Sequence, residues 1–207
     1  MNRIRRYRPG DRDGLYAICI QTGDAGQDAT ALYRDPHILP DIYTGPYLLL
    51  EPDLAFVLAD AKDRPAGYIV GTANTPRFVA RYQRDWLGLA AARYPPPGLA
   101  GSDEGRDAER IHELHHPEWM LREDLNDYPA HLHIALAAQA QGKGAGRALI
   151  DTYLAALRAQ RVSCVHLAMS TANIRARAFY DRLGFHYLAQ PTPTRVVLGR
   201  RTHPLPP

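Results

Sequence analysis

The chain lacks the features that mark secreted, membrane-spanning or strongly charged proteins. Its 207 residues include two cysteines, Cys19 and Cys164, which lie far apart inside apolar segments. Such a pair predicts small buried side chains in a reducing compartment and no disulfide framework. No apolar run reaches the length of about 18 residues that a membrane span needs, and the charged N-terminus is followed by no apolar region. We therefore expect a cytoplasmic protein without a signal peptide.

A surplus of one charge is also absent. Lys and Arg number 25 and Asp and Glu number 22, which gives a net charge of +3. This balance excludes a general polyanion binder, so no nucleic-acid partner is expected. Lysine itself is scarce, since only Lys62 and Lys143 occur and the other cations are arginines. Apolar residues make up 45% of the chain, enough for one core, so residues 1–207 are predicted to form a single domain.

Hydrophobic patterning predicts an α/β fold with a mixed sheet. A helix is expected to begin at Asp11, whose carboxylate would cap its first amides, and residues 22–46 are expected to form a loop with a helical turn or two. Residues 76–130 interrupt the pattern between the third and fourth strands, and their apolar content is too thin for a separate core. The expected strands are 2–8, 54–59, 65–72, 132–138, 162–169, 185–189 and 195–198; the other expected helices are 78–92, 107–116, 119–125, a helix through Leu149 and Leu157, and 173–183, with a disordered tail at 202–207.

A glycine-rich turn between a strand and an amphipathic helix carries the strongest chemical signal. It reads Gln141-Gly-Lys-Gly-Ala-Gly-Arg147. Glycines allow close approach of the backbone to an anion, and a helix N-terminus favours phosphate, so the turn predicts a pyrophosphate site. The P-loop pattern and the dinucleotide pattern are both missed, whereas Q/R-x-x-G-x-G/A is met. The alternative is that the glycines only allow tight packing of strand and helix.

A second pattern lies downstream, N-x-x-A-x-x-F-Y-x-x-x-G-F over Asn173–Phe185. With the turn, it makes the chain resemble the GNAT superfamily of acyl-CoA-dependent N-acetyltransferases over most of residues 2–198 apart from the insertion. The segments 7–19 and 66–72 and the long insertion also resemble the GNAT-like domain of animal O-GlcNAcases and its free-standing bacterial relatives. The resemblance implies a mixed, mostly antiparallel sheet splayed at its central parallel strands, with helices on both faces.

The resemblance also implies a cosubstrate, acetyl-CoA, and an amine substrate that the sequence does not identify. Backbone groups of the fourth strand would bond the pantetheine arm, and an amide near Leu136 would polarise the thioester carbonyl. Asn173 would bond the same arm or cap its own helix, and Tyr180 would protonate the leaving thiolate or pack beside Phe179. The implied cofactor-binding residues are Leu136, Ala137, Ala138, Gln141, Gly142, Lys143, Gly144, Ala145, Gly146, Arg147, Asn173, Phe179 and Tyr180.

The general base is less clearly indicated. The glutamate that the family often carries on this strand falls near Ala130, so no carboxylate is carried over. His133 is our preferred base, because the intrinsic pKa of histidine suits a base near neutral pH. Its side chain shares one strand face with that of His131. A hydrogen-bonded structural pair is the alternative, and Asp127 and Tyr128 are further candidates. The missing carboxylate leaves two hypotheses open: an N-acetyltransferase that works by direct attack of a primary amine, and an inactive acetyl-CoA-binding pseudo-enzyme.

Two further patterns carry weaker hypotheses. His112, Glu113 and His116 satisfy H-E-x-x-H, the zinc-protease motif, but Pro117 should end the helix at the second histidine, so no metal is expected. Asp24, Asp28, Asp35 and Asp41, with nearby tyrosines, form either a pocket for a cationic amine or a solvated acidic loop. A monomer or a homodimer is expected, without a membrane partner.

Overall fold

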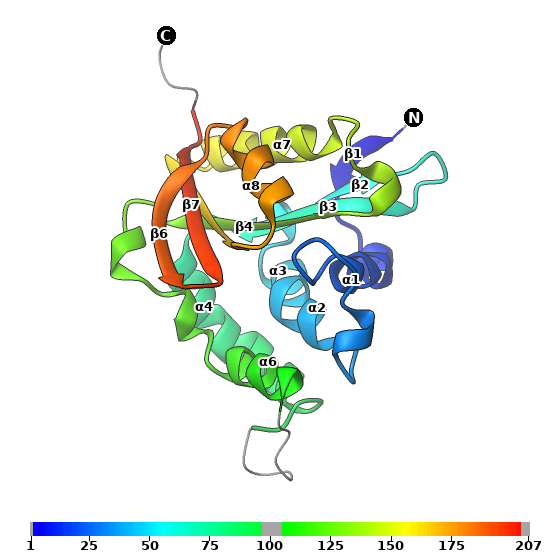
Figure 1. Cartoon of the computed structure of the whole chain (residues 1–207), viewed down its shortest axis with the longest axis vertical. Coiled ribbons are helices and arrows are strands. Elements are labelled where there is room, and N and C mark those ends of the chain that lie inside the picture. Colours follow the sequence, from blue (N-terminus) through cyan, green and yellow to red (C-terminus); the bar gives the residue numbers. More distant parts are fainter. Residues whose placement is uncertain (1, 97–104, 204–207) are drawn as a thin grey trace.

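The computed structural model describes residues 2–96 and 105–203. A single sheet of seven strands, in the order β1-β2-β3-β4-β5-β7-β6, runs through the molecule (Figure 1). Only β4 and β5 are parallel neighbours, and the other neighbouring pairs are antiparallel, which confirms the mixed sheet. The strands are β1 (Arg3–Arg6), β2 (Phe56–Ala59), β3 (Pro65–Thr72), β4 (Ala130–Leu136), β5 (Cys164–Ser170), β6 (His186–Thr192) and β7 (Arg195–Arg201).

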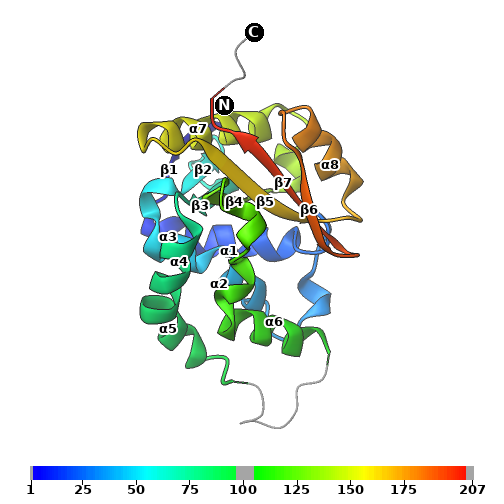
Figure 2. The same ribbon diagram turned by 90° about the vertical axis from the view of Figure 1, so that its left-hand side faces the viewer.

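Helices cover both faces of this sheet, as Figure 2 shows. Two of them, α7 and α8, lie on one face, and the helices of the first 120 residues lie on the other. The helices are α1 (Arg12–Gln21), α2 (Ile38–Tyr43), α3 (Gly45–Leu50), α4 (Thr75–Arg81), α5 (Leu87–Ala91), α6 (Arg106–His115), α7 (Ala145–Ala159) and α8 (Ile174–Asp181). Short 3-10 turns are η1 (Pro9–Asp11), η2 (Thr30–Leu32), η3 (Pro52–Leu54), η5 (Pro117–Met120), η6 (Glu123–Leu125) and η7 (Ala138–Ala140), and η4 (Tyr82–Trp86) is a π-helical turn between α4 and α5.

Two hydrophobic cores result from this layering. Alternate residues of the strands face opposite sides, so Leu132 joins the core under α7 and α8 while Val70 joins the core under α1, α2 and α3. The apolar stripe of α7 is buried as its 3.6-residue spacing predicts, with Leu149 and Leu157 fully covered.

The insertion at 76–130 packs onto the layer formed by α1, α2 and α3. Phe78, Trp86 and Leu114 are buried in the same core as the side chains of α1, α2 and α3. The insertion therefore shares a core with the N-terminal helices. The expected disordered tail at 202–207 lies mostly outside the described residues, but Thr202 is fully buried and its hydroxyl donates to the Val162 carbonyl at 2.8 Å.

One helix was not expected. Gly45-Pro46 reads as a helix breaker, yet α3 begins there, because proline fits the first turn, where its missing N–H is not needed. Tyr47 on this helix is fully buried and proves important for the site below. Among the described residues, no helix has the length and apolar content to cross a membrane.

The role of Asp11 also differs from the expected helix cap. Its carboxylate makes no capping bond to α1. It instead binds both terminal nitrogens of Arg5, at 2.7 and 2.8 Å, and accepts the N–H of Arg8 at 2.8 Å. Burial alone would raise the pKa of this carboxyl, but the bonds from Arg5 and Arg8 outweigh burial and lower it. Asp11 thus ties β1 to the start of α1.

Replacing Asp11 should therefore destabilise the fold. We expect Asp11→Asn to lower the free energy of unfolding by about 2 kcal/mol in urea denaturation, because a charge-assisted pair is broken while Asp63 still neutralises Arg5. The matched control is Asp53→Asn, which breaks the exposed Arg6–Asp53 pair and should have no measurable effect. Equal unfolding midpoints for the two variants would contradict this role.

Candidate functional site

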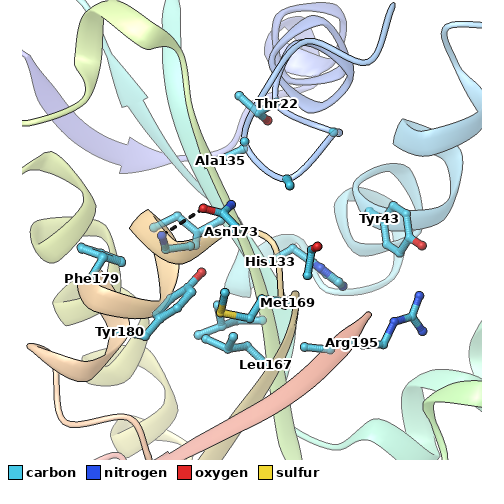
Figure 3. Close-up of a pocket in the computed structure, with 18 of the residues that line it drawn as sticks. Thr22, Tyr43, His133, Ala135, Leu167, Met169, Asn173, Phe179, Tyr180 and Arg195 are labelled. Carbon is cyan, nitrogen blue, oxygen red and sulfur yellow. Dashed lines mark hydrogen bonds between the residues drawn. The ribbon is translucent and has the colours of Figure 1, made fainter. Parts of the chain in front are cut away.

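The sheet opens between its two parallel strands. β4 and β5 pair in register only at Ala130–Val165 and His131–His166, whereas β4 pairs with β3 over six positions. Beyond His131 and His166 the strands part, and a cleft of about 1060 Å³ lies along the opening (Figure 3). Both strands, the glycine turn, α8 and the loop after α1 line this cleft. The expected splay at the central strands is therefore present.

The backbone of β4 directs alternate groups into this opening. The Ala137 N–H bonds the carbonyl of Ala66 on β3 at 3.0 Å. Because hydrogen-bonded pairs alternate in an antiparallel ladder, His133 and Ala135 also face β3, and Ile134 and Leu136 face the gap. Leu136, one of the three residues expected to bond the pantetheine arm, presents its N–H there, whereas the Ala137 N–H is already used on β3.

The glycines of the turn have two different roles, one in backbone conformation and one in helix packing. Gly142 and Gly144 adopt left-handed φ angles of 73° and 77°, and nothing lies within 4 Å of where a Cβ would stand. Gly146 has a different role, because a Cβ there would lie 3.1 Å from the ring of Phe179. The first two glycines leave open backbone beside the N-terminus of α7, and the third allows α7 to pack against α8. Tight packing thus accounts for Gly146, whereas Gly142 and Gly144 provide the open backbone that a pyrophosphate site would need.

The two polar residues of the downstream motif lie on α8 and face the cleft. The Asn173 side-chain oxygen accepts the Ala176 N–H at 3.0 Å and so caps the helix, which leaves the Asn173 amide N–H₂ to donate elsewhere. The Tyr180 hydroxyl lies in the cleft with no hydrogen-bond partner among the described residues, while its ring packs against Phe179 and Phe185. Burial raises the pKa of Tyr180, so the hydroxyl keeps its proton.

Tyr47 links two histidines on the opposite face of β4. The Thr75 hydroxyl donates to the Pro129 carbonyl at 2.9 Å and therefore accepts from His131 Nδ1 at 2.8 Å. His131 Nε2 then accepts the Tyr47 hydroxyl at 2.7 Å, and the Tyr47 oxygen accepts from His133 Nε2 at 3.0 Å. A carbonyl can only accept, so this chain of bonds fixes the direction of each donor. It leaves the Nδ1 lone pair of His133 free.

A third histidine, His166, lies beside these two, and no sequence pattern indicated it. His166 on β5 lies beside His131, with ring centroids 5.6 Å apart, and lines the cleft. Its Nδ1 donates to the Tyr128 carbonyl at 2.8 Å, so Nε2 carries the lone pair. The available signal was the alternation of β5, but nothing in the spacing of the chain brings positions 131 and 166 into register.

Burial keeps all three histidines uncharged. Desolvation lowers the pKa of His131 well below its usual 6.5. It also lowers the pKa of His133 to about 4, where repulsion by Arg195, and by His166 whenever that ring is protonated, adds to burial. The pKa of His166 is also lowered, chiefly by burial. At neutral pH these rings are therefore hydrogen-bonding groups without charge.

The far end of the cleft is built by the insertion, α2 and β7. The Glu113 carboxylate on α6 accepts Tyr43 Oη at 2.6 Å, Arg110 at 2.7 Å and Arg195 at 3.0 Å. The Arg195 guanidinium also lies over the ring of Trp119, 5.1 Å from its centroid. Figure 3 shows Tyr43 and Arg195 on the same side of the cleft as His133 and across from Phe179 and Tyr180.

Most of the expected site residues meet in this one cleft. Ala137, Ala138, Lys143 and Ala145 do not line it, and the Lys143 amine bonds the Gln139 carbonyl at 3.0 Å. The expected residues that line it are Leu136, Gln141, Gly142, Gly144, Gly146, Arg147, Asn173, Phe179, Tyr180 and His133. Gln141 is tied to the opening through its side-chain amide, which donates to the Leu136 carbonyl at 3.0 Å.

The other base candidates and the acidic loop lie elsewhere. Asp127 and Tyr128 do not line the cleft, and the Tyr128 hydroxyl bonds His186 at 2.9 Å. The four loop aspartates also lie off the cleft, so they form no pocket for a cationic amine there. Three of them have local partners: Asp28 bonds Thr30, Asp35 bonds Arg93, and Asp41 accepts the Tyr16 hydroxyl.

Nothing in the described part of the chain supports the zinc-protease hypothesis. His116 lies outside α6 with non-helical backbone angles, φ −121° and ψ 65°, as the following proline predicts. Glu113, which would be the general base, is instead bound by two arginines and Tyr43. In the described part of the chain, no three side chains of ligating type gather closely enough to hold a metal.

Comparison with known proteins agrees with this geometry. Residues 26–185 match the model of the acetyltransferase (GNAT) family. The chain belongs to the GNAT family. The protein SsHAT, known from a crystal structure, is 48% identical to this GNAT chain, and the similarity covers 98% of this chain and 99% of SsHAT with a TM-score of 0.94.

More distant relatives share only the fold or a short segment. PH1933 from Pyrococcus horikoshii is 14% identical over 97% of this chain and 98% of its own, with a TM-score of 0.61. A phosphinothricin acetyltransferase from Sinorhizobium meliloti, solved with AcCoA, is 13% identical over 97% of this chain and 88% of its own, with a TM-score of 0.51. Mycothiol acetyltransferase of Beutenbergia cavernae is 52% identical over 46 residues, which span 22% of this chain and 16% of that protein.

The buried histidines predict a pH-dependent stability. As the pH falls below 6.5, these histidines become protonated in the unfolded chain but stay neutral in the folded chain, in which His133 takes up a proton only at about pH 4. Protonation therefore favours the unfolded state, and the free energy of unfolding should fall as the pH decreases through this window. Urea denaturation across the window measures the slope, which His133→Gln should make shallower. An NMR titration of the wild type in which His133 becomes protonated near pH 6.5 would contradict the assignment.

Proposed function

We propose that the protein is an acetyl-CoA-dependent N-acetyltransferase that modifies a primary amine by direct attack. The observation that carries the proposal is the coincidence of two features in one cleft: strand groups free to bond at Leu136, and open left-handed backbone at Gly142 and Gly144 beside the N-terminus of α7. A pantetheine arm needs the first and a pyrophosphate needs the second. The residues present therefore fit acetyl-CoA.

Each residue of the cleft has a definite task in this proposal. Acetyl-CoA supplies an acetyl group activated as a thioester. Leu136 N–H, which faces the gap, donates a hydrogen bond to the acetyl carbonyl oxygen, and the Asn173 side-chain amide holds the pantetheine arm. Amides from Gly142 to Arg147 bind the pyrophosphate, with the Arg147 side chain beside them.

Tyr180 is suited to deliver a proton. Its hydroxyl has no partner among the described residues, and its raised pKa keeps the proton in place in the free protein. Negative charge that develops on the departing thiolate of coenzyme A lies in the same desolvated cleft, where its basicity rises too, so the Tyr180 hydroxyl can stabilise the leaving sulfur by a hydrogen bond and supply its proton. Tyr180 is therefore proposed as the general acid.

His133 is suited to receive the proton of the amine. Its Nδ1 lone pair is free, and the Tyr47 oxygen holds the other side of the ring. With a pKa of about 4, His133 does not remove a proton from a free ammonium ion, but it accepts one as the C–N bond forms and the nitrogen becomes acidic. Nε2 of His166 offers a second acceptor in the same cleft.

The protein is expected to act in the cytoplasm, as a monomer or homodimer.

A second candidate is an acetyl-CoA-binding protein without transferase activity. Among the described residues, no Asp or Glu lines the cleft, and the low pKa of His133 makes it a weak base. The resemblance of the sequence to the GNAT-like domain of O-GlcNAcases also favours this candidate. Release of coenzyme A in the presence of an amine distinguishes the two, because only the first candidate produces it.

Substitution of Tyr180 tests the proposed mechanism. Tyr180→Phe should reduce kcat for coenzyme A release by about 100-fold, because the general acid is lost, and leave the Kd of acetyl-CoA nearly unchanged. Tyr187→Phe, at an exposed tyrosine of β6, is the control and should keep full activity. Unchanged kcat in Tyr180→Phe would contradict the role. Acetyl-CoA that fails to raise the Tm of the wild type would contradict the proposed function itself.

A further inference from the structure

The charged residues that line the cleft are all of one sign. Among the described lining residues there is no carboxylate, although the chain as a whole is nearly balanced. The lining cations are six arginines: Arg110, Arg122, Arg147, Arg175, Arg182 and Arg195. A cleft with one sign of charge selects ligands of the opposite sign.

These arginines lie at two ends of the cleft. Arg147, Arg175 and Arg182 come from the first turn of α7 and from α8 and its end, beside the glycine turn. The phosphates of acetyl-CoA account for positive charge at that end. Arg110, Arg122 and Arg195 come from the insertion and β7, and Figure 3 shows Arg195 beside His133 and Tyr43, across the cleft from Tyr180. Phosphates bound at the glycine turn do not account for this second group.

Charge at this second end is not fully balanced. Glu113 is the one carboxylate that binds Arg110 and Arg195 closely, at 2.7 and 3.0 Å, so two cations share a single half-buried anion. A further carboxylate, Glu109, lies 3.6 Å from Arg110 but is mostly exposed to solvent, where its attraction is screened. Arg122 has its own partner, Asp124.

Donors at this end are also left over. The Nε atom of Arg110 is buried and has no hydrogen-bond partner. Arg195 donates to Glu113 through one terminal nitrogen, and its other two guanidinium nitrogens have no hydrogen-bond partner among the described residues. Because a buried donor without a partner is costly, the Arg110 Nε fits a site whose remaining acceptor comes from a ligand, and the partly exposed nitrogens of Arg195 are open to the same ligand.

The Arg195 guanidinium is held in place before any ligand binds. It lies over the Trp119 ring on one side and is tied to Glu113, so little side-chain freedom remains to be lost. A planar guanidinium in a fixed position matches a carboxylate. The histidines beside it carry no charge at neutral pH and so neither repel a cationic amine nor neutralise an anion.

We propose that the acceptor is an amine that also carries a carboxylate, whose carboxylate is bound by Arg195 and Arg110 while its amine faces His133. This inference rests on the proposed acetyltransferase function and adds the class of the acceptor. Acceptors with additional positive charge and no carboxylate, such as polyamines or lysine-rich peptides, meet arginines and no lining carboxylate at this end of the cleft.

Matched pairs of amines test the proposal. Glycine is compared with glycinamide, and L-alanine with L-alaninamide, so that one member of each pair carries a carboxylate and the other carries none. We expect the member with the extra carboxylate to show about tenfold or higher kcat/KM for coenzyme A release, and to raise the Tm of the protein without acetyl-CoA where its partner does not. Arg195→Gln should abolish both differences.

Arg201→Gln is the control, because Arg201 lies on the same strand outside the cleft, and this variant should keep both preferences. Equal kcat/KM and equal Tm within both pairs, or preferences that survive in Arg195→Gln, would overturn the inference. This failure is separate from that of the proposed function, which falls if acetyl-CoA does not bind. The Tm arm uses the amines alone, so it decides on the carboxylate site even if no acetyl transfer is seen.

Discussion

Strands β4 and β5 pair in register at only two positions, and the groups of the cleft take their places from the point where the strands part. β5 remains paired with β7 over seven residues and β4 with β3 over six, so each strand stays anchored on one side. The backbone groups left unpaired face the cleft, where water or a ligand can satisfy them, so the opening does not bury orphaned donors. The Gly142–Gly144 turn and the N-terminus of α7 follow directly from the open end of β4.

The insertion supplies one end of the cleft. Its helix α6 supplies Glu113, which gathers Tyr43 from α2 and Arg195 from β7 over sequence separations of 70 and 82 residues. Phe78 of the same insertion and Thr75 just before it lie against His131, and so support the chain of bonds that ends at His133. Acetyl transfer and acceptor choice would thus rely on different parts of the chain, which meet at the two histidines of β4.

Local patterns allowed much of the fold and the cofactor end of the site to be predicted. The glycine turn, the Asn173–Phe185 pattern and the alternation of β4 are each set within a few residues, so sequence spacing reports them directly. The acceptor end depends on contacts between distant segments, and His166, Arg195 and Glu113 gave no local signal of their partnership. The H-E-x-x-H pattern shows the same limit, because its glutamate is used by residues far away in the chain.

The most direct test of the central claim is amide hydrogen exchange of β4, measured by NMR with and without acetyl-CoA. The amides of Ile134 and Leu136, which face the gap, should exchange quickly in the free protein and slowly once acetyl-CoA is bound. The amides of His133 and Ala135, which face β3, should be protected in both states and serve as internal controls. Exchange at Ile134 and Leu136 that stays the same in the presence of saturating acetyl-CoA would contradict the account.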